Sequence, residues 1–337
     1  MSDRPSDADE LKMYSVSSIK AATNSFSLEN KLGEGGFGPV YKGELADSQE
    51  IAVKRLLQRS GQGLMEFKNV LILIARLQHM NLVRLLGFCI QGEERLLIYE
   101  TYQSKRVLLD WRKRFGFIEG IAQGLLYLHK YSRLRIIHRN LKTSNILLDK
   151  DMNPKISDFG MARIFKANES ETNTNRIVGN CNDYMALEYA MEGIFSIKSD
   201  VYSFGVLMLE IISGKRSHNI YHYDRPLNLV GYAWELWKED ALEILDPTMS
   251  DSAPRDQVLR CINVALLCVE HSPFDRPNMA EVLSMLSNEV QQLPMPKQPA
   301  FYVGTTTTNA TMASTSGERG GQTYSANGLS LTDMAGR

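Results

Sequence analysis

The sequence predicts an α+β chain with two lobes, a small antiparallel-sheet lobe that carries one helix and a larger helical lobe. Up to about residue 100, apolar residues alternate with polar ones around glycine turns, which is typical of antiparallel hairpins. From Asp110 onward, apolar residues recur at helical spacing. With 337 residues, 43% of them hydrophobic, the chain is long enough to give each lobe its own core.

Composition divides the chain into four segments. We expect a polar N-terminal lead (1–25) with a short helix near Ile19, the sheet lobe (26–100), the helical lobe (101–293) and a tail (294–337). The tail is rich in Ser, Thr and Gly and has few apolar residues, so we expect it to be disordered. A cleft between the two lobes would be the natural ligand site.

The sheet lobe is expected to contain four strand regions and one helix. Alternating apolar residues and glycine turns mark the strands, and the helix interrupts them. The predicted strand regions are 31–45, 50–56, 82–90 and 95–100, and the predicted helix is 63–79.

The helical lobe is expected to contain four long helices, over 109–130, 199–215, 256–270 and 278–290. The first has one apolar face, formed by Trp111, Phe115, Ile118, Ala122, Leu125 and Leu126. The second is apolar on nearly all sides and reaches Gly214, so it is predicted to be buried and to end there.

Charge and hydropathy exclude several classes of protein. A net charge of −1 does not favour nucleic-acid binding. The longest apolar run, residues 70–75, is far shorter than the ~20 residues of a membrane helix, and the N-terminus lacks a signal peptide. Four unclustered cysteines fit a reducing compartment, so we expect a cytoplasmic chain. Cys261 and Cys268 are expected in the core, and His218 and His222 in a surface loop rather than at a metal.

A glycine-rich motif points to phosphate binding. Gly33, Gly35 and Gly38 have G-x-G-x-x-G spacing, which also occurs in ordinary hairpins and in dinucleotide sites. A dinucleotide site needs a helix directly after the glycines, whereas Val40 continues a strand here. Lys54 on the next strand is therefore expected to contact the α- and β-phosphates of a nucleotide rather than to be an isolated surface lysine.

The segment RIIHRNLKTSNILLDKDMNPKISDFG, residues 135–160, carries the remaining phosphate-handling residues. It contains H-R-N-L-x-x-x-N, from His138 to Asn145, where the known motif has Asp in place of Asn140. It ends in D-F-G, which begins at Asp158. Asn145 and Asp158 supply oxygen atoms of the kind that Mg²⁺ prefers.

On these motifs the chain resembles the protein kinase family, and more closely the intracellular part of plant receptor-like Ser/Thr kinases of the S-domain, or G-type lectin, class. The resemblance covers about residues 26–299 and includes FSLENKLGEGGFGPVYKG and FSIKSDVYSFGVLMLEIISGK. It implies a two-lobed kinase fold, ATP and Mg²⁺ as cofactors, and protein hydroxyl groups as substrates. Other kinases or receptor complexes are the implied partners, at the inner face of the plasma membrane.

The resemblance also assigns roles to individual residues. ATP contacts are implied for Gly33, Gly35, Gly38, Val40, Ala52, Lys54 and Glu100. Mg²⁺ ligands are implied at Asn145 and Asp158, and catalytic-loop roles for His138, Arg139, Lys142 and, at the position of the usual base, Asn140. Asp200 is implied to brace the catalytic loop, and Arg276 to pair with Glu188.

Two substitutions remove acidic groups that the family pattern contains. Asn140 replaces the Asp that accepts the substrate proton, and an amide cannot hold a proton near neutral pH. A positioned base is worth ~10²–10⁴ in rate. Val70 replaces the Glu that pairs with Lys54, so we expect Lys54 to lose its anionic partner. Glu66 lies one helical turn earlier and would need the helix to slide to replace it.

Two segments also depart from the family pattern. The stretch between Glu100 and Leu109 is shorter than in the family, which affects the region beside the adenine pocket. The segment 158–188 has VGNCNDYMALE where the family has a pattern like VGTYGYMAPE. Ser170, Thr172 and Thr174 in this segment are candidate phosphorylation sites whose phosphate Arg139 would bind. Alternatively, they are polar residues of an exposed loop.

Three readings of the chain follow. The first is a pseudokinase, a kinase fold with weak or absent catalysis that binds partners and retains some ATP and Mg²⁺ binding. The second is an active ATP-dependent Ser/Thr kinase, favoured by the retained Gly33, Lys54, Asn145 and Asp158. The third is a decayed gene copy, favoured by the short stretch after Glu100. The removal of the base and of the partner of Lys54 favours the first.

Overall fold

A computed structural model describes most of the chain between residues 11 and 299. The described ranges are 11–35, 38–56, 61–74, 77–101, 109–165, 171–173, 184–217, 219, 227–249, 253–290 and 292–299, without the side chains of 61–66, 171 and 173. His218, His222 and the part of the predicted tail after residue 300 lie outside these ranges. Within them, no helix is long and apolar enough to span a bilayer.

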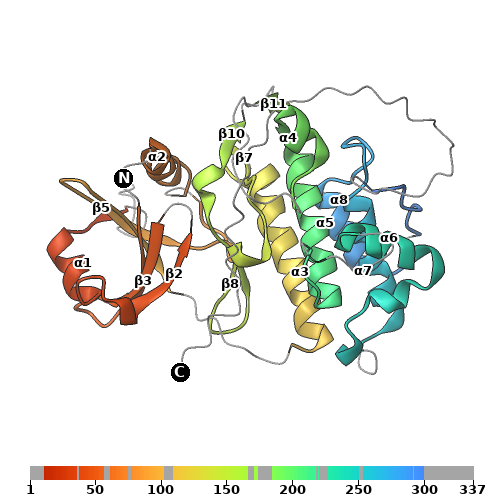
Figure 1. The fold of residues 1–337 in the computed structure, drawn as a ribbon, viewed down its shortest axis with the longest axis horizontal. Helices are drawn as coiled ribbons and strands as arrows, with labels where there is room; N and C mark the ends of the chain where they lie inside the picture. The colour runs from red at the N-terminus through yellow and green to blue at the C-terminus, as the bar shows by residue number, and fades with distance from the viewer. Residues whose placement is uncertain are drawn as a thin grey trace, which may run out of the picture. The chain divides into compact units, whose positions relative to one another are not determined.

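A six-stranded sheet forms the first lobe, in the order β1-β5-β6-β4-β3-β2 (Figure 1). Its strands are β1 (Lys12–Met13), β2 (Lys31–Gly35), β3 (Gly38–Glu44), β4 (Glu50–Arg55), β5 (Leu85–Gln91) and β6 (Glu94–Glu100). All neighbours pair antiparallel except β1, which pairs parallel with β5. The four predicted strand regions are therefore confirmed, and β1 is an addition.

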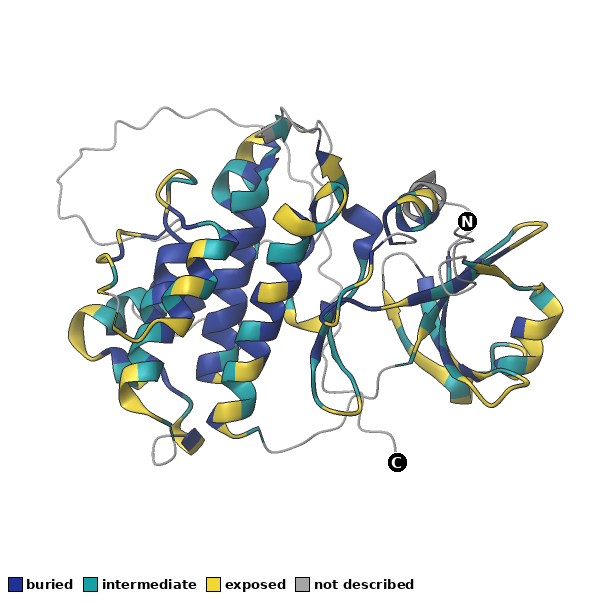
Figure 2. Ribbon diagram, turned by 180° about the vertical axis from the view of Figure 1, so that it is seen from behind, coloured by how far each residue is buried: buried dark blue, intermediate teal, exposed yellow. Residues whose placement is uncertain are grey.

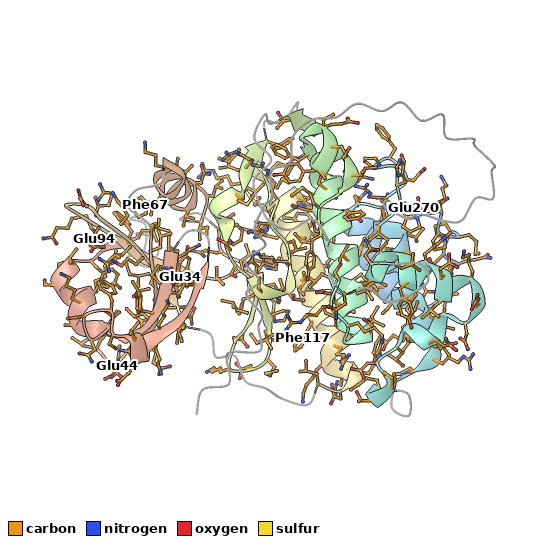
Figure 3. All side chains as sticks on the ribbon, viewed as in Figure 1. Glu34, Glu44, Phe67, Glu94, Phe117 and Glu270 are labelled. Carbon is orange, nitrogen blue, oxygen red and sulfur yellow. The ribbon has the colours of Figure 1, made fainter. Side chains whose placement is uncertain are left out.

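Two helices accompany this sheet, α1 (Val16–Ala22) and α2 (Gly61–Ile74). Ser15 caps α1 because its hydroxyl accepts a hydrogen bond from the Ser18 N–H. Ile19 of α1 is fully buried and packs in a cluster with sheet residues such as Ile51 and Ile98. On α2, Phe67 lies edge to face against Phe88 of β5. Figure 3 labels Phe67 on this helix. The helix predicted near Ile19 and the helix predicted over 63–79 are both present.

The second lobe is mainly helical. Its helices are α3 (Trp111–Leu126), α4 (Leu187–Glu192), α5 (Ile197–Ser213), α6 (Leu229–Glu239), α7 (Arg255–Cys268) and α8 (Met279–Ser287). One π-helical turn, Tyr127–Tyr131, continues α3. Figure 2 shows the long central helices, of which α5 is buried along nearly its whole length, whereas α3 also has an exposed side. The four predicted long helices are confirmed, with boundaries that differ by a few residues.

The core of this lobe forms around α5. Its apolar residues are buried on nearly all sides, as the sequence predicts, and Gly214 ends the helix with φ of 66°. Gly205 lets α7 approach closely, because a Cβ there would lie 2.7 Å from the Cβ of Cys268. Cys261 and Cys268 are both fully buried, as predicted for core residues. On α3, Phe115 and Leu126 are only partly buried, at the edge of the predicted apolar face.

Three short strand pairs carry the loops of the site. They are β7 (Arg135–Ile137) with β10 (Arg163–Phe165), β8 (Ile146–Leu148) with β9 (Pro154–Ile156), and β11 (Glu171–Asn173) with β12 (Ile194–Ser196).

Near the C-terminus, the structure describes residues 292–299. The Lys297 ammonium group pairs with Asp275, and the Lys297 backbone N–H donates to Glu270. These residues include the first part of the predicted tail.

Candidate active site

The loop after β7 is held by a buried carboxylate. Asp200 of α5 is fully buried and accepts hydrogen bonds from the backbone N–H groups of His138 and Arg139, both at 2.8 Å. His129 lies 2.9 Å from the same carboxylate through its Nε2 atom. Arg139 has φ of 65°, a conformation that L-residues rarely adopt. The Asp200 carboxylate therefore fixes an otherwise unfavourable turn in the candidate catalytic loop.

The side chain of His138 is part of the core behind this loop. Its Nε2 atom lies 2.9 Å from the carbonyl oxygen of Ser157, and its ring packs edge to face against Phe159. Burial lowers the pKa of His138, and this effect outweighs the attraction of Asp200. The ring is thus neutral near pH 7 and joins the catalytic loop to the D-F-G turn.

Lys54 and Asp158 form an ion pair between the two lobes. Lys54 lies on β4, and Asp158 precedes a 3₁₀ turn with φ of 64°. The Lys54 Nζ atom is 3.0 Å from Oδ1 of Asp158, and both side chains are largely buried. Burial alone would raise the pKa of Asp158, but the charge and hydrogen bond of Lys54 hold it below its ordinary value.

This pair corrects the expectation that Lys54 lacks an anionic partner. Val70 is 1% exposed in the apolar core, so no acid is present at that position of α2. Asp158 supplies the charge instead. The side chain of Glu66 lies outside the described part of the molecule. The neighbouring Asn69 joins α2 to the D-F-G turn, because its Nδ2 atom donates to the Gly160 carbonyl at 3.3 Å.

Asn140 completes the group around Asp158. Its Nδ2 atom donates to Oδ2 of Asp158 at 2.9 Å, and its side chain is mostly buried. The backbone oxygen of Asn140 in turn accepts a 2.7 Å bond from Nδ2 of Asn145. Both oxygens of Asp158 are thus engaged, one by an ammonium group and one by an amide. Sequence reasoning placed these residues in one site but did not find the bond between Asn140 and Asp158.

The glycine motif lies at the β2–β3 hairpin. Gly33 and Gly35 are on β2, and Gly38 and Val40 are on β3. Gly38 has φ of 132°, and a Cβ atom there would lie 2.1 Å from the carbonyl oxygen of Arg55. Only glycine fits at this position. Residues 36–37, the tip of the motif, lie outside the described ranges.

The other predicted ATP contacts, Ala52 and Glu100, lie on β4 and β6 of the same sheet. Ala52 of β4 pairs with Tyr99, and Glu100 ends β6 opposite Ile51. The segment 102–108, which the sequence marks as shorter than in the resembling family, is outside the described residues. The described strands therefore bring Val40, Ala52 and Lys54 to neighbouring positions of the sheet, with Val40 paired to Lys54.

Arg139 is engaged by aromatic and backbone groups. Its guanidinium lies 4.1 Å from the ring centre of Phe195 and donates to the hydroxyl of Tyr189 at 2.6 Å and to the carbonyl of Met161 at 3.2 Å. Thr172 of β11 pairs with Phe195 across the β11–β12 ladder. Ser170 and Thr174 lie outside the described residues, so the three phosphorylation sites remain predictions.

A second ion pair joins Arg276 to Glu188, the glutamate at the end of the sequence ALE. Arg276 is 1% exposed and binds both oxygens of Glu188, at 2.7 and 3.0 Å. It also donates to the carbonyl groups of Glu270, Lys198 and His271. The two residues that the resemblance pairs are therefore in direct contact.

Asp158 and Asn145 carry the oxygen atoms that would suit Mg²⁺ at this site. Mg²⁺ is held by carboxylates together with substrate phosphates. Across the described ranges, no group of three or more His, Cys, Asp or Glu residues could hold a metal. Each oxygen of Asp158 accepts one hydrogen bond, which leaves lone pairs for a metal ion, and Lys142 adds a positive charge nearby. Asn145 uses its amide nitrogen internally, which leaves its oxygen as the chemically suitable ligand atom.

Comparison with known proteins identifies the family. The protein tyrosine and serine/threonine kinase family matches residues 26–286. The chain is 53% identical over 344 positions to the G-type lectin S-receptor-like serine/threonine-protein kinase CES101 of Arabidopsis thaliana, which covers 97% of this chain and 40% of that protein. It is 57% identical over 304 positions to the kinase B120 of the same class and organism, covering 87% and 36%.

A third relative, the receptor-like serine/threonine-protein kinase SD1-7 of Arabidopsis thaliana, is 55% identical over 311 positions, covering 88% of this chain and 37% of that protein. The chain therefore spans less than half the length of these relatives. A protein kinase domain generally uses ATP and Mg²⁺. The match over residues 26–286, with the sheet and helical lobes described above, shows that the chain belongs to the protein tyrosine and serine/threonine kinase family.

Proposed function

We propose that this chain is a pseudokinase of receptor-like kinase signalling, which transfers phosphate poorly and acts by binding partners. The observation that carries the proposal is the side chain of Asn140. At the position of the proton acceptor it presents an amide, and its Nδ2 atom donates to Asp158. Because a carboxylate near neutral pH only accepts hydrogen bonds, the amide nitrogen must face Asp158. The side chain is thus a donor toward Asp158 and has no basic group for a substrate hydroxyl.

The surroundings of Lys54 support the same proposal. In an active kinase, Lys54 would hold the phosphates while a glutamate of the adjacent helix orients it. Here the equivalent position is Val70 in the apolar core, and Lys54 pairs with Asp158. Lys54 and Asp158 thereby orient each other, in place of the glutamate that would orient Lys54 in an active kinase.

Nucleotide binding is part of the proposal. Gly38 approaches the backbone of Arg55 as only glycine can, and Lys54 lies opposite Val40 on the next strand. These positions suit a bound triphosphate. We infer that partners are other kinases or receptor complexes at the cytoplasmic face of the plasma membrane, in keeping with the printed class of the relatives.

An active Ser/Thr kinase is the second candidate, and one observation favours it. Lys54, Asn145 and Asp158 are all retained and lie in one connected group of contacts. If positioning and electrostatics alone sufficed, the missing base would slow turnover without abolishing it.

Turnover separates the two candidates. Purified protein is incubated with labelled ATP, Mg²⁺ and a generic protein acceptor, beside the variants Asn140→Asp and Asp158→Asn. The pseudokinase proposal expects the wild type to remain near the Asp158→Asn background and Asn140→Asp to gain at least ~10²-fold, the lower value of a positioned base. Wild-type turnover at about 1–100 s⁻¹, the usual kinase range, would refute it.

Partner binding is tested with the same negative control. If the chain signals by binding, Asp158→Asn retains the receptor complexes that the wild type forms in plant cells and restores signalling in cells that lack the chain. Loss of signalling in this variant, at unchanged protein level and with complexes intact, would favour the active kinase instead.

A further inference from the structure

After α1 the chain turns back through three residues in the left-handed conformation. Asn24, Ser25 and Phe26 have φ of 49°, 55° and 59°, which L-residues rarely adopt. A run of this kind persists only where the surrounding contacts fix it, and such strained residues often serve function. The turn belongs to the first lobe, where α1 lies beside β3 (Figure 1).

Thr23 ties this turn to the elements on both sides of it. Its side chain is fully buried, and its hydroxyl donates to the carbonyl of Ile19 at 2.8 Å. The same hydroxyl accepts a hydrogen bond from the N–H of Phe26 at 3.2 Å. The backbone oxygen of Thr23 accepts a 3.1 Å bond from Nδ2 of Asn30, the residue before β2. The turn is therefore fixed to α1 on one side and to the start of β2 on the other.

The turn places the ring of Phe26 on two neighbouring strands. The ring centre lies 5.3 Å from the ring centre of Tyr41 on β3 and 4.8 Å from the guanidinium of Arg55 at the end of β4. A guanidinium is attracted to the face of an aromatic ring. The Nε atom of Arg55 also donates to Glu94 at 2.9 Å. The side chain of Arg55 is thus held between a ring and a carboxylate.

Both residues that the ring contacts are next in the chain to residues of the candidate nucleotide site. Arg55 follows Lys54, and a Cβ atom at Gly38 would lie 2.1 Å from the carbonyl oxygen of Arg55. Tyr41 follows Val40, which pairs with Lys54 across the β3–β4 ladder. Because the interior is close-packed, a shift of Arg55 or Tyr41 would move the backbone that supports Lys54 and the glycine hairpin.

We propose that Phe26 is a positioning residue for the nucleotide site, which fixes the β2–β3 hairpin and the end of β4 from the turn after α1. The inference rests on the nucleotide binding proposed above. It makes the affinity for nucleotide depend on a turn that holds no predicted ATP contact. If Phe26 only stabilised the fold, its removal would lower the melting temperature and leave the affinity of the folded protein unchanged.

The first test measures the Kd of a fluorescent ATP analogue for the full chain in excess MgCl₂, well below the melting temperature of every variant. Phe26→Ala should raise the Kd by at least about fivefold, the lower end of the usual coupling between two sites. Phe26→Tyr keeps the ring and should bind like the wild type. The control Leu28→Ala, whose side chain is 82% exposed, should also leave the Kd unchanged. A Phe26→Ala protein that melts earlier but keeps the wild-type Kd would overturn the proposal.

Phe26→Leu covers the case in which Phe26→Ala does not fold. Leucine keeps most of the apolar volume but has no π face for Arg55, so the Kd should rise by about two- to fivefold. In that case an unchanged Kd in Phe26→Leu would overturn the proposal.

The second test needs no nucleotide. Amide hydrogen exchange is followed by mass spectrometry in β2 and β3, with α7 of the other lobe as the internal control. Phe26→Leu should exchange faster than the wild type in β2 and β3 and at the wild-type rate in α7. An equal change in both lobes, or no change in either, would overturn the inference. If the wild type bound no nucleotide, the proposed nucleotide binding would fail together with this inference, whereas an unchanged Kd in the variants would refute this inference alone.

Discussion

Asp200 is the residue on which the shape of the catalytic loop is expected to depend most. The change Asp200→Asn keeps the size of the side chain but replaces one acceptor oxygen by an NH₂ group. Asp200 now accepts two backbone bonds at 2.8 Å and one bond from His129 at 2.9 Å. An asparagine can keep at most the two bonds on Oδ2, those with the His138 N–H and the His129 ring, and it turns its NH₂ group toward the Arg139 N–H. With about 1.5–3 kcal/mol for each hydrogen bond to a charged group, the one lost bond predicts a loss of about 1.5–3 kcal/mol, to which the two opposed donors add.

The pH dependence of stability gives this prediction a second readout. Burial alone would raise the pKa of Asp200, but the hydrogen bond and charge of His129 and the donors from His138 hold it below its ordinary value. The folded-state pKa is thus depressed. The resulting stabilisation is complete above the unfolded-state pKa of about 3.9 and is lost as pH falls through the folded-state value. Asp200→Asn lacks this contribution, so its stability should fall less steeply in acid.

Chemical denaturation of both proteins measures the free energy of unfolding at neutral pH and on acidification. The control is Asp151→Asn on an exposed turn, which should change stability by no more than about 0.5 kcal/mol. A loss below about 1 kcal/mol for Asp200→Asn, with an unchanged pH profile, would show that Asp200 does not hold the loop in place.

Two further predictions concern a buried ion pair and a buried apolar side chain. Arg276→Ala leaves Glu188 without its ion-pair partner and should lower the free energy of unfolding by about 3–5 kcal/mol. Lys297→Ala breaks an exposed ion pair and should lower it by no more than about 1 kcal/mol. Equal losses in the two variants would contradict the prediction. Val70→Glu buries a carboxylate whose pKa rises on folding, so its melting temperature should drop more at neutral pH than below pH ~4, unlike that of Val70→Gln. A melting temperature that drops more in acid than at neutral pH would mean that the new acid reaches Lys54, because the ammonium group would depress its pKa.

The sequence predicted the main elements because periodicity and end signals are local. The residues of α5 are apolar on nearly every side, and Gly214 ends the helix in the left-handed conformation that glycine favours. In contrast, β1 has only two residues, Lys12 and Met13, both exposed, so no alternation could reveal it. It forms because Gly87 of β5 leaves room for its backbone: a Cβ at Gly87 would lie 2.0 Å from the Lys12 carbonyl oxygen.

The sequence predicted that several motif residues lie close together, but not which of them are in contact. Motif spacing brought Lys54, Asn140 and Asp158 together correctly. It could not reveal that Asp158 serves as the partner of Lys54, because that contact joins strands and loops 104 positions apart. Val70 is buried, and its neighbour Asn69 joins α2 to the D-F-G turn, a contact that the sequence alone did not reveal.

The family pattern predicts acids at positions 70 and 140, and their replacement is better understood as one coupled change than as two separate ones. If Val70 alone had replaced an acid, Lys54 would turn to Asp158, and an Asp at position 140 would then face a carboxylate already engaged by a lysine. If Asn140 alone had replaced an acid, Asp158 would accept the amide while Lys54 kept its glutamate. Together, Val70 and Asn140 leave one lysine, one aspartate and one amide whose charges and hydrogen bonds match. The effects of restoring the two acids should therefore not add, because each restored acid changes the partner available to the other.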